Sequence, residues 1–275
     1  MPIRQKMPDF VNLAATGTAS LDLPTGMSYH NLIFYFGLSG ALTRAMIKEI
    51  RVLINGKVFI RAPASILHRD NLYKGSVDNA AFFILDFEEP RARNFADQIS
   101  SIVHTFSGVQ TFKIEFDIVG ATSPRIVTHA NVTATKLPLG LLPCFFKQSI
   151  DMVSVGTHQI GYSYGKAQHV LKRVHIVPTQ ANVEVLPADV LATISVSKDN
   201  IPLYQKVSPL LAVYYQSHYE AICQTNFATV DFVEDNNVGL NLMPADDAVI
   251  LWEFEALQAA RLDLYYSVLA SINSI

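Results

Sequence analysis

The chain has 275 residues, of which 50% are hydrophobic and only 16% charged, and its net charge is -3. Soluble domains average roughly 25% charged residues, so the surface left in water is predicted to be small or covered by partners. The absence of a basic excess argues against a protein that neutralises nucleic-acid phosphates. The first ten residues lack the apolar stretch of a secretory signal, and Cys144 and Cys223 cannot form a disulfide framework, which indicates a reducing cytoplasm.

Most of the chain alternates apolar with polar residues, which is the period of a β-strand. Turn residues separate these runs, and Asn55-Gly56 is the strongest hairpin signal among them. The sequence therefore predicts an all-β protein, a β-sandwich rather than a series of βαβ units. Short helices are predicted at residues 62–73, 92–103, 209–223 and 245–251.

The two halves of the chain repeat one plan at an offset of about 145 residues, which predicts two similar domains. A strand, the Asn55-Gly56 turn, a strand and a helix after Pro63 are matched by residues 192–196, a turn at 198–200, a strand and a helix after Pro209. Residues 82–87 also match 227–232, and residues 113–116 match 261–264. A proline-rich stretch between the halves is typical of a stiff linker. The predicted parts are an arm at 1–8, a first domain at 9–136, a linker at 137–146 and a second domain at 147–275.

One segment has the pattern of a serine hydrolase. Gly161 to Gly165 fits G-x-S-x-G with Ser163 as the nucleophile, and Asp189 or Asp199 followed by His218 supplies the chain order of that fold. The residues after Gly165 alternate like a strand, whereas the nucleophile elbow leads into a helix. The favoured interpretation is an inter-strand loop, and a hydrolase that uses Ser163 remains a remote alternative.

Metal and basic sites are weakly indicated. The 8 histidines lack transition-metal spacing, and acidic clusters at 88–89, 234–237 and 246–247 offer the oxygens that calcium prefers without the spacing of a calcium loop. We therefore assign no catalytic or cofactor-binding residue and leave any metal ligands unknown. The basic residues fit solvated faces, subunit contacts or, at the amino terminus, an extended arm; they are Arg4, Lys6, Arg91, Arg93, Lys172 and Arg173.

Five segments that run in order over most of the chain carry a resemblance to one family: residues 23–29, 50–57, 111–117, 145–148 and 155–176. They resemble the major capsid proteins of tailless, membrane-containing icosahedral bacteriophages of the corticovirus type, which belong to the double-jelly-roll lineage. The sequence departs from the family in its loops, and residues 187–200 are expected to be such a loop.

This resemblance implies a tandem double jelly roll with strands roughly perpendicular to a shell. It implies a homotrimer with a nearly hexagonal outline, which tiles an icosahedral capsid around an internal lipid membrane. The implied partners are further copies of the chain, minor capsid or vertex proteins and the viral membrane, with no direct contact to nucleic acid. The implied location is the virion, after synthesis and assembly in the cytoplasm of a bacterial host. No enzymatic activity and no cofactor are implied, although calcium accompanies such virions as a structural ion.

The alternative from another class is a receptor- or carbohydrate-binding β-sandwich, such as a spike or lectin-like module. That function requires aromatic side chains in an exposed groove, whereas the single tryptophan, Trp252, lies in a strand-like segment and is predicted to be in the core. A separate expectation concerns the arm: deletion of residues 1–8 is predicted to leave the trimer intact, because no strand pattern begins before Asp9.

Overall fold

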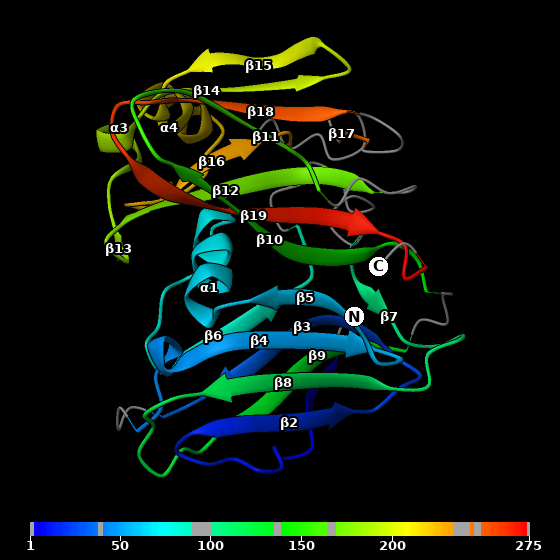
Figure 1. The fold of residues 1–275 in the computed structure, drawn as a ribbon. Coiled ribbons are helices and arrows are strands. Elements are labelled where there is room, and N and C mark those ends of the chain that lie inside the picture. Colours follow the sequence, from blue (N-terminus) through cyan, green and yellow to red (C-terminus); the bar gives the residue numbers. More distant parts are fainter. Residues whose placement is uncertain are drawn as a thin grey trace. The chain divides into compact units, whose positions relative to one another are not determined.

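The computed structural model describes residues 3–37, 41–89, 101–134, 139–163, 169–233, 243–244 and 249–273. Strands predominate in this part of the chain and helices are short (Figure 1), which confirms the predicted fold class. The chain divides into two compact units: unit 1 contains residues 1–145 and 271–273, and unit 2 contains residues 146–270. Among the described residues, every helix falls short of the length and apolarity needed to cross a bilayer.

Unit 1 consists of two antiparallel sheets with the strand orders β1-β9-β3-β6 and β2-β8-β4-β5, and β7 also pairs with β3. This is the arrangement of a jelly roll, in which the chain passes repeatedly from one sheet to the other. The elements are β1 (Ile3–Lys6), β2 (Gly17–Leu23), β3 (Ser28–Tyr35), a 3-10 turn (Arg44–Met46), β4 (Ile47–Ile54), β5 (Lys57–Ala62), α1 (Ala64–Tyr73), β6 (Phe82–Asp86), β7 (Val103–His104), β8 (Phe112–Ile118) and β9 (Val127–Thr133).

The core of unit 1 follows from the alternation that the sequence shows. Along β8, every second side chain from Phe112 to Ile118 is buried and the intervening ones are partly exposed. Phe116 of β8 meets Phe34 of β3 edge to face with ring centroids 5.0 Å apart, so the inner faces of the two sheets pack through aromatic rings.

Unit 2 repeats this arrangement with the strand orders β10-β19-β12-β16 and β11-β18-β14-β15, and β13 and β17 also pair with β12. The elements are β10 (Leu142–Met152), β11 (Gly156–Gly161), β12 (Val170–Gln180), β13 (Val183–Glu184), α3 (Pro187–Val190), β14 (Leu191–Lys198), β15 (Ile201–Val207), α4 (Pro209–His218), β16 (Ala228–Asp231), β17 (Met243–Pro244), β18 (Ile250–Ala256) and β19 (Ala260–Ala270).

The core of unit 2 is centred on Trp252 of β18, which has an exposed fraction of 0%. Its ring meets Tyr266 of β19 edge to face, with centroids 5.9 Å apart, so it joins the two sheets of unit 2. The prediction that Trp252 belongs to the core is confirmed.

Strand pairing confirms part of the internal repeat and corrects the rest. The series β4, turn, β5 and α1 is matched by β14, turn, β15 and α4, as predicted. The match of residues 113–116 with 261–264 is wrong, because β8 pairs with β2 and β4 whereas β19 pairs with β10 and β12. The counterpart of β8 is β18, which pairs with β11 and β14. Both candidates alternate in the same way, and only strand pairing distinguishes them.

The two hairpin turns of the repeat share their chemistry. Asn55-Gly56 and Asp199-Asn200 all have positive φ angles, between 50° and 78°, as a two-residue hairpin requires. Asn55 Oδ1 accepts a hydrogen bond from the backbone N–H of Gln110 at 2.8 Å, and Asp199 Oδ1 accepts one from that of Val249 at 2.9 Å. Each turn is thereby tied to the segment that leads into the neighbouring strand, β8 or β18.

The predicted amino-terminal arm contains a strand. Residues Ile3–Lys6 form β1, which pairs with β9, so the expectation that no strand begins before Asp9 is wrong. All four side chains of β1 are exposed, and burial therefore imposes no alternation that a sequence pattern could reveal. The next residue, Met7, is 2% exposed and donates its N–H to Thr128 O.

Four other predicted segments need correction. Residues 142–146, expected in a stiff linker, begin β10; Pro143 is tolerated there because it is near the start of the strand. Residues 187–200 are predicted to form a loop that contains the strand match at 192–196. The strand is confirmed as part of β14, which is hydrogen-bonded to β15 and β18, whereas the loop is wrong because α3 precedes that strand directly. In the helix expected at 245–251, residues 250 and 251 belong to β18 and 245–248 lie outside the described residues. Of the helix expected at 92–103, residues 92–100 also lie outside them, and Val103 begins β7.

Candidate functional site

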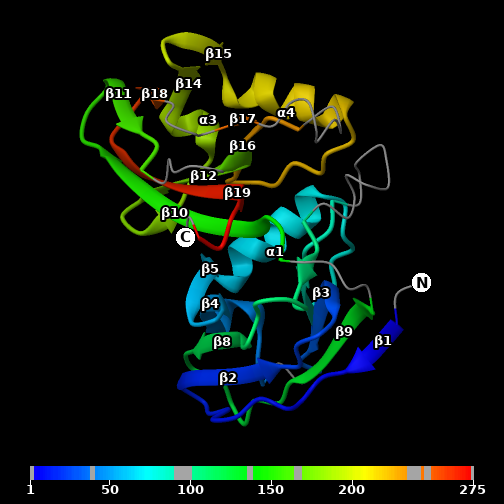
Figure 2. The same ribbon diagram turned by 90° about the vertical axis from the view of Figure 1, so that its right-hand side faces the viewer.

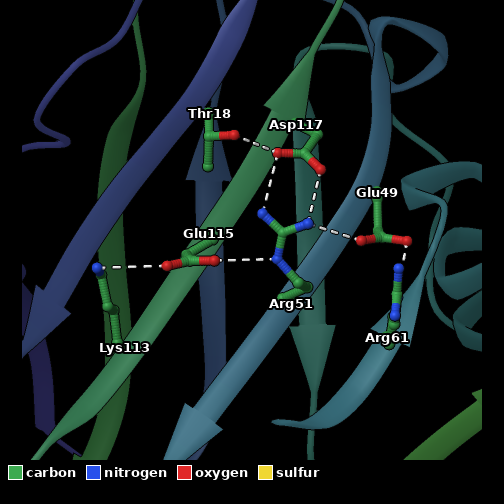
Figure 3. A network of polar contacts seen from close by, with 7 residues as sticks. All are labelled: Thr18, Glu49, Arg51, Arg61, Lys113, Glu115 and Asp117. Carbon is green, nitrogen blue, oxygen red and sulfur yellow. Dashed lines mark hydrogen bonds and ion pairs between the residues drawn. The ribbon is translucent and has the colours of Figure 1, made fainter. Parts of the chain in front are cut away.

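A network of charged side chains covers the outward face of the sheet β2-β8-β4-β5 in unit 1 (Figure 3). Alternation turns Arg51 of β4 and the carboxylates Glu115 and Asp117 of β8 away from the core. The register places Arg51 directly opposite Glu115, and Glu49 opposite Asp117. Strand pairing therefore gathers four charges that are far apart in the sequence.

Arg51 is the centre of this network. Its Nη1 and Nη2 atoms bind the two oxygens of Asp117 at 2.7 and 3.0 Å, which is a bidentate pair. Its Nε binds Glu115 Oε2 at 2.9 Å, and Nη1 also binds Glu49 Oε1 at 2.7 Å. The Arg51 side chain is only 22% exposed, so it contacts three carboxylates in a partly desolvated position.

Three further residues complete the network at its edge. Arg61 Nε binds Glu49 Oε2 at 2.9 Å, and Lys113 Nζ lies 3.3 Å from Glu115 Oε1. Thr18 of β2 donates its hydroxyl hydrogen to Asp117 Oδ1 at 2.6 Å. Three acidic and three basic side chains balance one another, so the network stabilises the sheet face rather than presenting a net charge to a ligand.

The electrostatics of the network agree with this role. The hydrogen bond to Asp117 raises the pKa of Arg51 above its ordinary value, although burial opposes the rise. Burial by itself would raise the pKa of Glu115 and of Asp117, but the hydrogen bonds and charge of Arg51 outweigh it and lower both values. These carboxylates remain ionised near neutral pH and are poorly suited to general acid–base chemistry.

The same positions in unit 2 hold a different set of side chains. The register places Glu253 of β18 opposite Ser195 of β14 and opposite Gln159 of β11. Gln159 Nε2 donates to Glu253 Oε2 at 2.8 Å, and Thr193 Oγ1 donates to Glu255 Oε2 at 3.1 Å. Ser195 of unit 2 thus occupies the position that Arg51 has in unit 1. The carboxylates of unit 2 accept hydrogen bonds from neutral side chains and not from an arginine.

A second candidate surface lies on α4, which packs against β14 and β16 within unit 2 (Figure 2). Ser208 caps this helix, since its Oγ accepts the N–H of Leu211 at 3.2 Å, and Pro209 occupies the first helical position. Beside the helix is an apolar groove of about 320 Å³, which we call the α4 groove. Its lining includes Leu186, Pro187, Leu210, Val213, Cys223 and Phe227.

The residues proposed for a hydrolase have other partners. Ser163 Oγ accepts a hydrogen bond from Gln148 Nε2 at 2.6 Å. Asp199 accepts from Val249 in its turn, and the His218 ring lies against Tyr219 with centroids 5.2 Å apart. Asp189 lies in α3. The described contacts of these residues give no Ser-His pair, and residues 164–168 of the motif lie outside the described residues.

The predicted acidic and basic clusters are partly described. Glu88 Oε1 lies 2.6 Å from His30 Nδ1, and Glu89 is 6% exposed, so residues 88–89 do not fit an open calcium site. Among the described residues, no group of three or more His, Cys, Asp or Glu side chains could hold a metal ion. Residues 234–237 and 246–247, like Arg91 and Arg93, lie outside the described residues, so calcium at those clusters stays a prediction.

The interpretation of Lys172 and Arg173 as a solvated face is wrong. They are 2% and 4% exposed, because β12 pairs along both of its edges and is buried for most of its length. Arg173 Nε lies 3.6 Å from Asp231 Oδ2 of β16, which compensates its charge.

The Arg51 network and the α4 groove were not identified from the sequence. The alternating acidic residues of β8 are visible there, but the register that brings them to Arg51 is not. The apolar run after Pro209 fits a buried helix as well as an exposed one.

Comparisons with known proteins agree with this architecture. Residues 4–133 match the family model of the viral coat protein P2 N-terminal domain, which covers most of unit 1. The crystal structure of the major capsid protein P2 from bacteriophage PM2 is similar over 100% of both chains, with 17% identity and a TM-score of 0.88. A comparison with curated protein sequences found no match.

Two more distant structures share the fold. The STIV MCP aligns with 98% of this chain and 97% of its own at 13% identity and a TM-score of 0.69. A chain of the PBCV-1 virus capsid aligns with 98% and 95% at 9% identity and a TM-score of 0.65. The resemblance to double-jelly-roll capsid proteins and the tandem jelly-roll fold are therefore confirmed.

Proposed function

We propose that this chain is the major capsid protein of a virus, with a structural role and no catalytic activity. The observation that carries the proposal is the repeated jelly-roll strand order in both units, together with the match of residues 4–133 to a viral coat protein domain. Likeness to the PM2 protein over the full length of both chains supports the same role for the whole chain.

The proposed mechanism is self-assembly into homotrimers. Two similar units per chain give a trimer six similar corners, so that it has a nearly hexagonal outline and can tile an icosahedral shell. Obligate interfaces of this kind bury roughly 2,000 Å² or more per pair and are enriched in aromatic residues. A composition of 16% charged residues with 11 tyrosines suits such surfaces.

The location and partners follow from this role. We expect the protein in the virion, around an internal membrane and beside minor capsid or vertex proteins, after assembly in the cytoplasm of a bacterial host. The net charge of -3 supports a shell protein without direct nucleic-acid contacts.

Negative-stain imaging of the purified protein tests the proposal. Hexagonal particles with a mass three times that of the 30.4 kDa chain are expected. Single-chain particles at all concentrations would overturn the assembly mechanism.

The two alternatives are tested separately. Trp252 is buried and therefore cannot bind a sugar, which argues against a carbohydrate-binding module. Binding of the purified protein to a glycan array would support that function instead. Ester hydrolysis that disappears in Ser163→Ala would establish the hydrolase, and the expected result is no turnover in either protein.

A further inference from the structure

The helices α1 and α4 occupy the same place in the repeat but differ in what they expose. Each follows a hairpin and has a proline at or just before its first residue, and each packs against the next strand along the chain, β6 or β16. The helix position held by Ala64 in α1 is 0% exposed, whereas its counterpart Leu210 in α4 is 72% exposed. Leu67 is 5% exposed and its counterpart Val213 is 37% exposed. These two positions are therefore buried in α1 and exposed in α4.

The open side of α4 is mostly apolar, and Ser217 and His218 are the exposed polar residues of this helix. We call it the α4 face and define it by Leu210, Leu211, Val213, Tyr214 and Tyr215, which are 37% to 72% exposed. Residues 209–218 contain no Asp, Glu, Lys or Arg, whereas α1 contains Arg69 and Asp70. An exposed apolar patch of this kind marks a surface that another molecule covers.

The size of the α4 face is appropriate for a protein interface. Tyr214 and Tyr215 are 68% and 45% exposed, and a tyrosine carries roughly 150 to 250 Å² of surface, so the pair leaves on the order of 200 Å² in water. With the three aliphatic side chains the α4 face reaches on the order of 500 Å², most of the roughly 800 Å² that each partner buries in a standard interface. The adjoining α4 groove, of about 320 Å³, offers a recess for one or two large side chains.

The chemistry of the face favours a protein over a lipid surface. Helices that bind bilayers carry Lys and Arg beside their apolar side, and α4 has neither. Tyrosine is enriched in the centres of protein interfaces, and a recessed groove provides shape that a fluid bilayer does not use. Most soluble oligomers are symmetric assemblies of identical chains, and the proposed function already requires copies of this chain to associate, so a second copy is the favoured occupant.

We propose that the α4 face and the α4 groove bind a second copy of this chain and form the principal contact between chains in the assembled protein. This inference rests on the proposed function and adds to it the surface that holds the copies together.

The test replaces the apolar contact without adding net charge. The double variant Leu210→Asp with Tyr214→Lys removes the two most exposed side chains of the α4 face. It also introduces an acidic residue in the first turn and an ion pair four residues apart, both of which favour the helix. The matched control is Val153→Asp with Val155→Lys, at exposed positions between β10 and β11 of unit 2, where the residues are 79% and 70% exposed.

Light scattering coupled to size exclusion, over a hundredfold range of protein concentration, measures the mass of each variant. We expect the unchanged protein and the control to assemble, and the α4 variant to elute near 30.4 kDa or to need at least tenfold more protein to assemble. A cooperative thermal unfolding transition of the α4 variant would exclude misfolding as the cause. Assembly of the α4 variant at the concentration of the unchanged protein would overturn the inference and leave the proposed function in place. Equal loss in both variants would overturn the assignment to α4, and a monomeric unchanged protein would overturn the proposed function itself.

A cross-linking measurement tests the occupant directly. Benzoylphenylalanine incorporated at position 214 should yield, on illumination, a product of twice the chain mass whose peptides come from two copies. If the unchanged protein binds lipid vesicles and the α4 variant loses that binding while still assembling, the face is a lipid contact and the inference is overturned.

Discussion

Glu115 and Glu253 occupy the same position in the two units, but Glu115 lies opposite Arg51 whereas Glu253 lies opposite Ser195. The repeat has therefore kept the acidic side chain on the outward face of the sheet and changed its partner. In unit 1 the partner is a cation with three carboxylates around it, and in unit 2 it is a set of neutral hydrogen-bond donors. Removal of the cation should consequently affect unit 1 alone.

We expect Arg51→Met to destabilise unit 1 by about 2 kcal/mol, because it leaves three carboxylates close together without their shared cation. Urea unfolding followed by circular dichroism measures the loss. The control Arg61→Met, at a side chain that is 64% exposed, should cost less than about 0.5 kcal/mol. Trp252, the single tryptophan, reports on unit 2. A large change in its fluorescence transition in Arg51→Met would contradict an effect confined to unit 1.

Acid should weaken unit 1 through the same network. The pKa values of Glu115 and Asp117 are lowered in the folded protein, so they contribute stability that is complete above their ordinary values of 4.5 and 3.8 and is lost as the pH falls through the lowered values. The urea midpoint, measured between roughly pH 6 and pH 3, should fall with acid and fall less steeply in Arg51→Met. Parallel curves for the two proteins would show that Arg51 does not cause the shifts.

Gly56→Ala should destabilise unit 1 by about 1 to 2 kcal/mol, because φ at Gly56 is +78° and an alanine there enters the left-handed region. Nothing lies within 4 Å of an added Cβ, so the cost comes from the backbone alone. Gly161→Ala is the matched control, since its added Cβ is equally free of neighbours and its backbone is not in that region. Thermal unfolding should separate the two variants; a Gly56→Ala protein as stable as Gly161→Ala would rule out the strained turn.

Two truncations separate the hydrogen bonds of β1 from the burial of Met7. Removal of residues 1–6 deletes an exposed edge strand and should lower stability by about 1 kcal/mol, while exposing the edge of β9 to aggregation. Removal of residues 1–8 also deletes the buried Met7 and should cost about 2 kcal/mol more. Differential scanning calorimetry measures the unfolding temperatures of the two truncated proteins, and the shorter one should unfold at the lower temperature. Equal unfolding temperatures would show that Met7 contributes little to stability. Survival of the trimer after removal of residues 1–8 stays a prediction, and light scattering on the same samples measures it.

The sequence alone predicted those parts of the fold in which local chemistry is decisive. The alternation of apolar and polar residues predicted a strand-rich fold. Residues that tolerate positive φ angles predicted both hairpin turns, at Asn55-Gly56 and Asp199-Asn200. Prolines marked the starts of α1 and α4: Pro209 is the first residue of α4, where its fixed φ angle fits the helix, and Pro63 is the residue before α1. The core position of Trp252 followed from its place in an alternating run.

Only the tertiary structure decided features that depend on pairing between distant segments. β1 has four exposed side chains and exists because β9 offers a hydrogen-bonding edge. The counterpart of β8 is β18 rather than β19, which strand neighbours show and alternation does not. The Arg51 network likewise depends on register, since a shift of one residue would turn its charges toward the core. Local sequence sets the conformation of each segment, whereas its neighbours are chosen by hydrogen bonding and burial over the whole chain.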